Sequence, residues 1–150
     1  MNNLYNDSDV ETIIERLEKL TPASKRLWGT MSVAQMLAHC NVSLETAMGL
    51  NFPKRKFIGR IFGKLLKLKF LDANPMVKNS ITEDYYVTSD DVYDFEKEKT
   101  KSIELIRTFY NNGPEKCTKH PHSYFGKLKP DEWAMLKWKH FDHHLRQFGA

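Results

Sequence analysis

Cysteine is scarce in this chain, and long apolar runs are missing. The two cysteines, Cys40 and Cys117, lie in different segments and match neither a zinc-knuckle nor a redox spacing, so we expect free thiols in a reducing compartment. The chain begins without a basic cluster or an apolar stretch, which argues against a secretory signal, and no run is long enough to cross a bilayer. These absences predict a cytoplasmic protein without stable membrane association.

Strand signals are almost absent, as are repeats, low-complexity segments and interdomain linkers. With 41% hydrophobic and 12% aromatic residues, the 150 residues can form one domain with a sizeable core, which we expect to span 1–150. The net charge of +4 is modest and partly local. It permits an anionic partner, but we predict no nucleic-acid binding.

Apolar residues recur at helical spacing in four long segments. Asp7 or Ser8 can cap the first, and Ser32 with Gln35 forms a capping-box pattern before the second. The first predicted helix ends at about residue 20, and the other three span 33–49, 92–111 and 130–148. Four such helices predict an all-α four-helix bundle.

A shorter helix is predicted over 55–71, after Pro53, as an insertion between the second and third bundle helices. Its cations include Arg60, Lys64 and Lys67, and its apolar stripe consists of Ile58, Ile61, Phe62, Leu65 and Leu68. The helix either covers the bundle with a solvated basic face, which we favour, or forms a membrane-surface or anionic-substrate patch. We expect its cations at the rim of the site. Segment 72–91 is predicted as a loop, with a short extended piece at 85–87.

The last predicted helix carries two histidines four residues apart. Residues at this spacing lie on one face of an α-helix, so the imidazoles of His140 and His144 can hold one metal ion. His39 is the best candidate for a third ligand, because it lies within a second amphipathic helix; the alternative is a hydrogen-bonded core histidine. Three imidazoles plus water are typical of a catalytic metal centre, whereas structural zinc sites fill all four positions.

Two blocks of sequence carry a family resemblance. The segment 28–40, WGTMSVAQMLAHC, resembles the second-helix signature of DinB-like proteins. The ending 125–149, which includes KHFDHHLRQFG, resembles a bacterial branch of that superfamily described as a domain of unknown function. The resemblance implies a DinB/YfiT-like four-helix bundle with an inserted short basic amphipathic helix. It also implies a divalent metal on His39, His140 and His144. Some relatives are thiol S-transferases or thiol-dependent isomerases.

Several neighbours of these histidines have two interpretations. Gln35 can reach a metal-bound water or, as we favour, only complete the capping box. Cys40 is predicted to be a small buried hydrophobe. Asp142 can orient a ligand imidazole, although we favour a solvated surface carboxylate. His143 lies about 100° around the helix from its neighbour and is expected to face solvent or the rim of a pocket.

Two further histidines are left out of the ligand set. His120 and His122 lie in a predicted loop, 115–129, that could cover the site. The spacing of the helical pair is also that of zinc proteases, but those enzymes need Glu as general base where this chain has Phe141.

Three functions stay open on these observations. The favoured one is a metal-dependent enzyme that activates a small-molecule thiol or a water, by thiol transfer or hydrolysis, with no catalytic residue assigned. The alternative is a non-catalytic stress-response protein that binds a metal or small ligand. The third is an interaction module built on residues 54–69. The metal is zinc, nickel, iron or manganese, and a homodimer is compatible with the sequence.

Overall fold

Helices make up nearly all the regular structure of residues 1–72, 74–78 and 93–150, the part of the chain that this computed structural model describes. Within those residues there is no strand, and only an isolated bridge joins His122 to Gly126. No described helix is both long and apolar enough to span a membrane. The elements are α1 (Asp7–Glu18), α2 (Val33–Ala47), α3 (Phe57–Phe70), α4 (Phe95–Asn112), the 3₁₀ helix η2 (Pro114–Lys116) and α5 (Pro130–Gln147).

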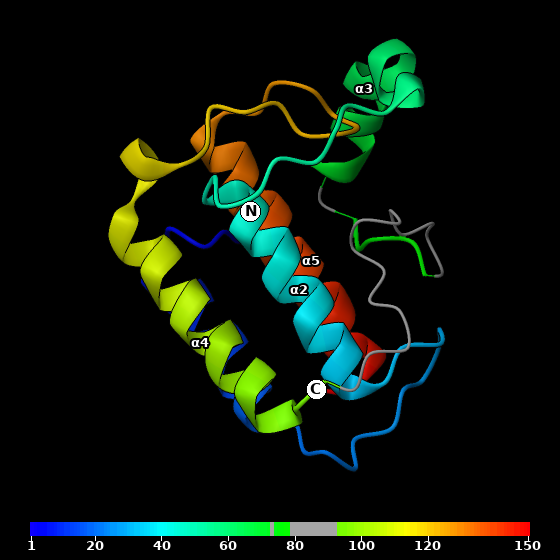
Figure 1. Ribbon diagram of the computed structural model, residues 1–150, viewed down its shortest axis with the longest axis vertical. Helices are drawn as coiled ribbons and strands as arrows, with labels where there is room; N and C mark the ends of the chain where they lie inside the picture. The colour runs from blue at the N-terminus through cyan, green and yellow to red at the C-terminus, as the bar shows by residue number, and fades with distance from the viewer. Residues whose placement is uncertain (73, 79–92) are drawn as a thin grey trace.

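Four of these helices form a bundle, and α3 projects from it (Figure 1). α2 packs against α4 and α5, and α1 packs against the same two helices. The predicted all-α bundle with an inserted helix is therefore confirmed. Its core is built from large apolar side chains of all four helices, among them Val10, Ile13, Leu17, Met36, Leu37, Leu44, Ile106, Trp133, Phe141 and Leu145.

A buried polar cluster orients α2 between its neighbours. The Asn41 side chain donates to the Glu98 carbonyl oxygen at 3.1 Å, and Ser102 Oγ donates to Asn41 Oδ1 at 2.7 Å. Asn41 lies about 200° around α2 from His39. The side of α2 that bonds to α4 is therefore roughly opposite the side that carries His39, which faces α5.

The predicted capping box of α2 is confirmed. Ser32 Oγ accepts from the Gln35 N–H at 3.2 Å, and Gln35 Oε1 accepts from the Ser32 N–H at 2.8 Å. Asn6, rather than Asp7 or Ser8, caps α1, because its side-chain oxygen accepts from the Asp9 N–H.

Other helix boundaries differ from the predicted ones by a few residues. α3 begins at Phe57, two residues later than expected. The Lys56 N–H donates to the Ser123 carbonyl oxygen, and the backbone at Lys56 is extended. α4 begins at Phe95, where Asp94 caps it. The predicted extended piece at 85–87, and most of the predicted loop 72–91, lie outside the described residues.

The predicted packing of the basic helix is wrong. Its apolar stripe does not cover the bundle: five of its members are more than half exposed, namely Ile58, Ile61, Phe62, Leu65 and Leu68. The buried face of α3 is instead made by Gly59 and Gly63, which lie against the Tyr124 backbone. A Cβ on either glycine would lie 2.5 Å from the Tyr124 carbonyl oxygen, so only glycine permits this close approach.

Candidate metal centre

Three histidine side chains from two packed helices meet inside the bundle. His39 projects from the middle of α2, while His140 and His144 lie one turn apart on α5. His39 and His144 are 3% and 6% exposed, and His140 is half-buried. The structure thus brings together the three residues that the sequence selected.

The three rings form a compact triangle. Every pair of ring centroids is 4.7 Å apart, and one donor atom from each ring lies within 4.8 Å of the others. His39 Nε2 and His140 Nε2 are 2.8 Å apart. Two imidazole nitrogens on one tetrahedral zinc would be about 3.3 Å apart, since each Zn–N bond is about 2.0–2.1 Å. To hold one zinc ion together, these two nitrogens would therefore have to separate by about 0.5 Å.

A hydrogen-bond chain sets the tautomer of His144. The Gln147 amide donates from Nε2 to the Trp28 carbonyl oxygen at 2.8 Å, so its Oε1 faces His144 Nδ1, also at 2.8 Å. Oε1 can only accept, which places the His144 proton on Nδ1 and leaves Nε2 with a free lone pair. This is the arrangement that orients metal-binding histidines in proteins.

Glycine makes room for this chain. Gly29 has φ of 77°, and a Cβ there would lie 2.5 Å from Gln147 Nε2. Gln147 was not among the site residues predicted from the sequence. Its signal was the i, i+3 spacing from His144, but its partner Trp28 is 119 residues away along the chain, so the pairing appears only in the fold.

Burial keeps the histidines of α5 neutral. It lowers the pKa of His140 well below its usual value, helped by repulsion from His144 and His39. Burial is also the largest cause that lowers the pKa of His144 to about 3, with His39 adding to it. A neutral imidazole binds metal without first losing the imidazolium proton, so these two rings suit a cation at neutral pH.

A buried lysine lies one turn before His140 on α5. Lys137 is 2% exposed, its Nζ donates to Ser43 Oγ at 2.7 Å, and it lies 5.1 Å from the centroid of the Trp133 ring. Its charge contributes to the lowered pKa of His140. This residue was not predicted from the sequence, although its i, i+3 spacing from His140 places it on the same side of α5.

Asp142 has neither of its two expected roles. It is 7% exposed, and its carboxylate pairs with Arg16 at 2.8 Å and Arg146 at 3.0 Å. Both expectations, a partner for a ligand imidazole and a solvated surface carboxylate, are therefore wrong. The sequence could not reveal this ion pair because Arg16 comes from α1, 126 residues earlier.

Cys40 and Gln35 behave as expected. Cys40 is fully buried, its thiol lies 3.9 Å from Met36 Sδ, and burial raises its pKa, so it is a core residue rather than a nucleophile. Gln35 is engaged in the capping box. His143 is half-buried, with its ring 5.8 Å from that of Trp28, and it is not part of the three-histidine group.

The two loop histidines do not join the group either. His122 is buried, stacks on Phe125 with centroids 4.4 Å apart, and accepts at Nδ1 from the N–H groups of Tyr124 and Phe125. The ring of His120 contacts that of Phe52 at 5.1 Å. His122 therefore organises the loop on which α3 rests, and it does not cover the histidine site.

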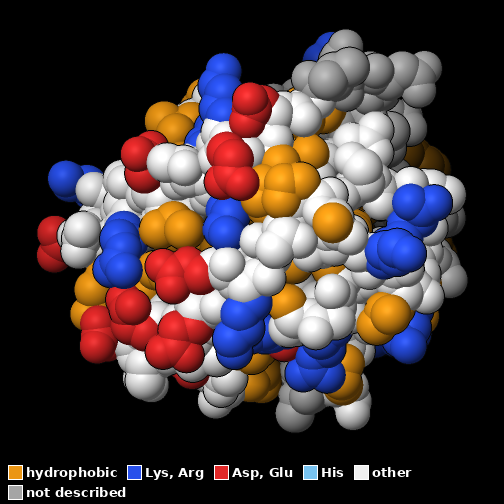
Figure 2. Space-filling model, turned by 90° about the horizontal axis from the view of Figure 1, so that it is seen from below, with side chains coloured by type: hydrophobic (Ala, Val, Ile, Leu, Met, Phe, Trp, Pro, Cys, Tyr) orange, Lys and Arg blue, Asp and Glu red, His pale blue; other side chains and the backbone are white. Residues whose placement is uncertain are grey.

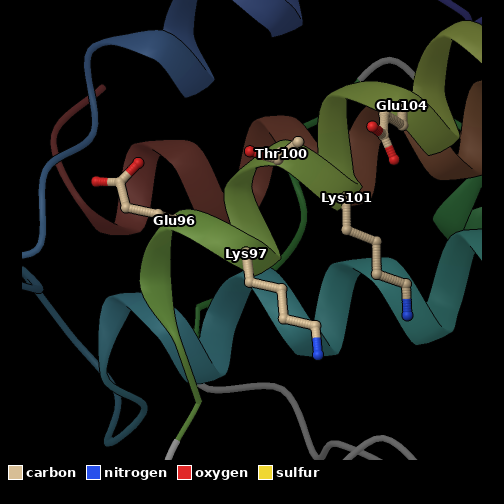
Figure 3. Close-up of a pocket in the computed structure, with 5 residues that line it drawn as sticks. All are labelled: Glu96, Lys97, Thr100, Lys101 and Glu104. Atoms are coloured by element: carbon tan, nitrogen blue, oxygen red, sulfur yellow. The ribbon is translucent and has the colours of Figure 1, made fainter.

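A surface hollow lies elsewhere on the bundle. It is lined by five residues from one side of α4, and Lys97 and Lys101 extend from there toward α2 (Figure 3). Lys101 pairs with Glu45 of α2 at 2.8 Å. The hollow holds no histidine, so it is separate from the candidate metal centre.

A family model described as a protein of unknown function (DUF1569) matches residues 4–150. No curated protein and no solved structure matches the chain.

Replacing Gln147 with Leu should change the tautomer of His144. In metal-free wild type, nitrogen-15 NMR should show the His144 proton on Nδ1, because Gln147 Oε1 accepts it. In Gln147→Leu the ring should shift toward the Nε2–H form. Gln35→Ala is the matched control, since Gln35 bonds within its own cap. An Nδ1–H signal that is equally strong in Gln147→Leu would contradict the assignment.

His122 should contribute to the pH dependence of folding. Burial, with the Lys137 and Arg55 charges, lowers its folded-state pKa well below the unfolded value. Below about pH 6.5 the unfolded chain therefore binds a proton at His122 that the folded chain does not bind. The contribution of His122 to folding stability is fully present above that pH and decreases as the pH falls below it. His122→Asn keeps an acceptor for the two N–H groups but does not titrate.

Denaturant unfolding of metal-free protein between about pH 7 and pH 5 tests this. Wild type should lose more stability across that range than His122→Asn. His120→Asn serves as the control for a substitution in the same loop that leaves the core unchanged. Equal losses in wild type and His122→Asn would show that His122 is not the group responsible.

Proposed function

Since the chain belongs to the family of proteins of unknown function DUF1569, we propose its function from the site itself: a divalent-metal centre that activates a small-molecule thiol or a water. The observation that carries the proposal is the convergence of His39, His140 and His144 within 4.8 Å. The reaction we propose is thiol transfer or hydrolysis. Two buried free cysteines suit the cytoplasmic location that we also propose.

The family resemblance supports a finer assignment, to the DinB-like superfamily. That resemblance implied three ligand positions from sequence alone, and the same three histidines are the ones that lie together in the bundle. Thiol S-transferases among DinB-like proteins make a thiol the favoured substrate. The helical order, with α3 inserted between α2 and α4, is compatible with this assignment.

The ligand set favours an open centre over a structural one. Three imidazoles leave at least one coordination position, and a divalent ion held there would lower the pKa of a coordinated thiol or water. Gln147 keeps the His144 lone pair directed inward, and burial keeps the imidazoles of His140 and His144 unprotonated. Zinc, nickel, iron and manganese all accept histidine ligands.

A non-catalytic role as a metal- or ligand-binding stress-response protein is the second candidate. The observation that favours it is the low exposure of His39 and His144, at 3% and 6%. Such burial suits retention of an ion more directly than turnover of a substrate. Turnover assays with panels of thiols and electrophiles, set against equilibrium binding of the same compounds, separate the two candidates.

Protein purified without an affinity tag should contain one divalent ion per chain by elemental analysis. Alanine at His39, His140 or His144 should abolish stoichiometric binding, because two imidazoles hold an ion far more weakly than three. His120→Ala is the control, with circular dichroism to verify folding of each variant. Full metal occupancy in the His140→Ala, His144→Ala double variant would refute the site.

A low-molecular-weight thiol should change the visible spectrum of cobalt-substituted protein. The change is expected because the open position lets a thiolate bind cobalt directly. The same thiol should leave the spectrum of a cobalt protein with a closed four-residue shell unchanged. A wild-type spectrum that is indifferent to every thiol and to pH would rule out the open centre while leaving metal binding intact.

A further inference from the structure

We propose that α3 binds an anionic lipid surface through its exposed apolar face. The inference concerns residues other than the three histidines and does not depend on the metal centre. Three observations carry it: the apolar face is solvent-exposed, the opposite face is fixed to the bundle, and the charged residues of segment 54–69 are all basic.

α3 projects from the bundle (Figure 1), and its large apolar side chains are exposed. At about 100° per residue they fall within an arc of roughly 140° on the helix. No described segment covers them, and their exposures are Phe57 75%, Leu68 72%, Leu65 68%, Ile61 58%, Ile58 56% and Phe62 53%. Proteins that remain free in water rarely expose a contiguous apolar patch of this kind, so the arc marks an interaction surface.

The opposite side of α3 is fixed, which holds the arc outward. Gly59 and Gly63 lie against the Tyr124 backbone, and the Phe70 ring packs on Phe125 with centroids 5.0 Å apart. Lys67 Nζ pairs with Glu132 Oε1 of α5 at 2.6 Å. With this face fixed to the bundle, α3 cannot turn its arc into the core without breaking these contacts.

The charge around the arc selects the partner. Residues 54–69 contain seven lysines and arginines and no acidic residue, which exceeds the net charge of +4 for the whole chain, so the remainder is net acidic. Arg60 and Lys64 lie on the flank between the arc and the fixed face, and both are exposed. At the opposite end of the molecule, acidic and basic side chains are interspersed (Figure 2).

An exposed apolar arc flanked by cations matches a bilayer surface with anionic headgroups. The apolar side chains enter the boundary between headgroups and acyl chains, and the cations contact the headgroups. Two copies of this chain joined through α3 would bring two cationic helices together, which disfavours a dimer by this face. Nucleic acid would engage the cations but would leave the apolar arc in water.

Co-sedimentation of the full chain with lipid vesicles tests the proposal. Vesicles containing phosphatidylglycerol should retain the protein, and vesicles of phosphatidylcholine alone should retain much less. Added salt should weaken the binding, because exposed charges act over only about 10 Å at 0.1 M ionic strength. Arg60→Gln with Lys64→Gln should weaken it at least about tenfold.

The apolar arc has its own variant and control. Phe57→Ser with Ile61→Ser and Leu65→Ser should abolish vesicle binding, and because all three side chains are exposed, folding should be unchanged. Leu27→Ser is the matched control, since Leu27 is 69% exposed but lies outside α3. Circular dichroism and metal content confirm that each variant keeps its fold.

Three outcomes would overturn the proposal. Wild type that fails to bind phosphatidylglycerol vesicles at low salt would exclude a lipid surface. Binding that depends on the two cations but not on the apolar residues, and that nucleic acid reproduces, would assign α3 to a polyanion instead. A dimer in analytical ultracentrifugation that the triple serine variant loses would identify a second copy of the chain as the occupant.

Discussion

The contact between α2 and α5 is the constraint on which the candidate site depends. It places one imidazole from α2 against two from α5, with every pair of ring centroids 4.7 Å apart. Bringing three basic rings so close inside a bundle core is tolerable only while they are uncharged, and burial lowers the pKa of His140 and His144 accordingly. The same packing that stabilises the fold therefore prepares nitrogen lone pairs for a cation.

Helical periodicity was enough to predict the bundle and the histidine pair of α5. Each helix, its apolar stripe and the spacing of the two histidines follow from residues that are close together in the sequence. The i, i+4 spacing of His140 and His144 fixes their common face, and the apolar stripe fixes which way that face turns. His39 required the family resemblance as well, since nothing local to α2 says which helix it meets. Gln147 and Asp142 were missed or misread because their partners, Trp28 and Arg16, lie more than a hundred residues away.

The error on α3 has a different origin. An amphipathic pattern shows that a helix has an apolar side, but it does not show what that side contacts. The packing of α3 is decided by two glycines. Because Gly59 and Gly63 have no side chain, the backbone of α3 can approach that of Tyr124, and the side of the helix that carries the glycines is the buried one. A helix that packs through its glycines keeps its large apolar side chains exposed for another partner. The positive charge of α3 favours an anionic partner.

The candidate metal centre and the proposed lipid-binding helix α3 both involve α5, at different positions on that helix. Glu132, which anchors α3, lies eight residues before His140 on α5, about 12 Å along the axis. Lys139 also ties the end of α3 to α5, donating to the carbonyl oxygens of Phe70 and Asp72 at 2.8 Å, but it lies about 100° around the helix from His140. Beyond these anchors, in the part of α5 that carries His140 and His144, the helix is fixed by fully buried Phe141 and Leu145. Because this part of α5 is held by the core, we expect occupation of the α3 surface to leave the geometry of the three histidines unchanged.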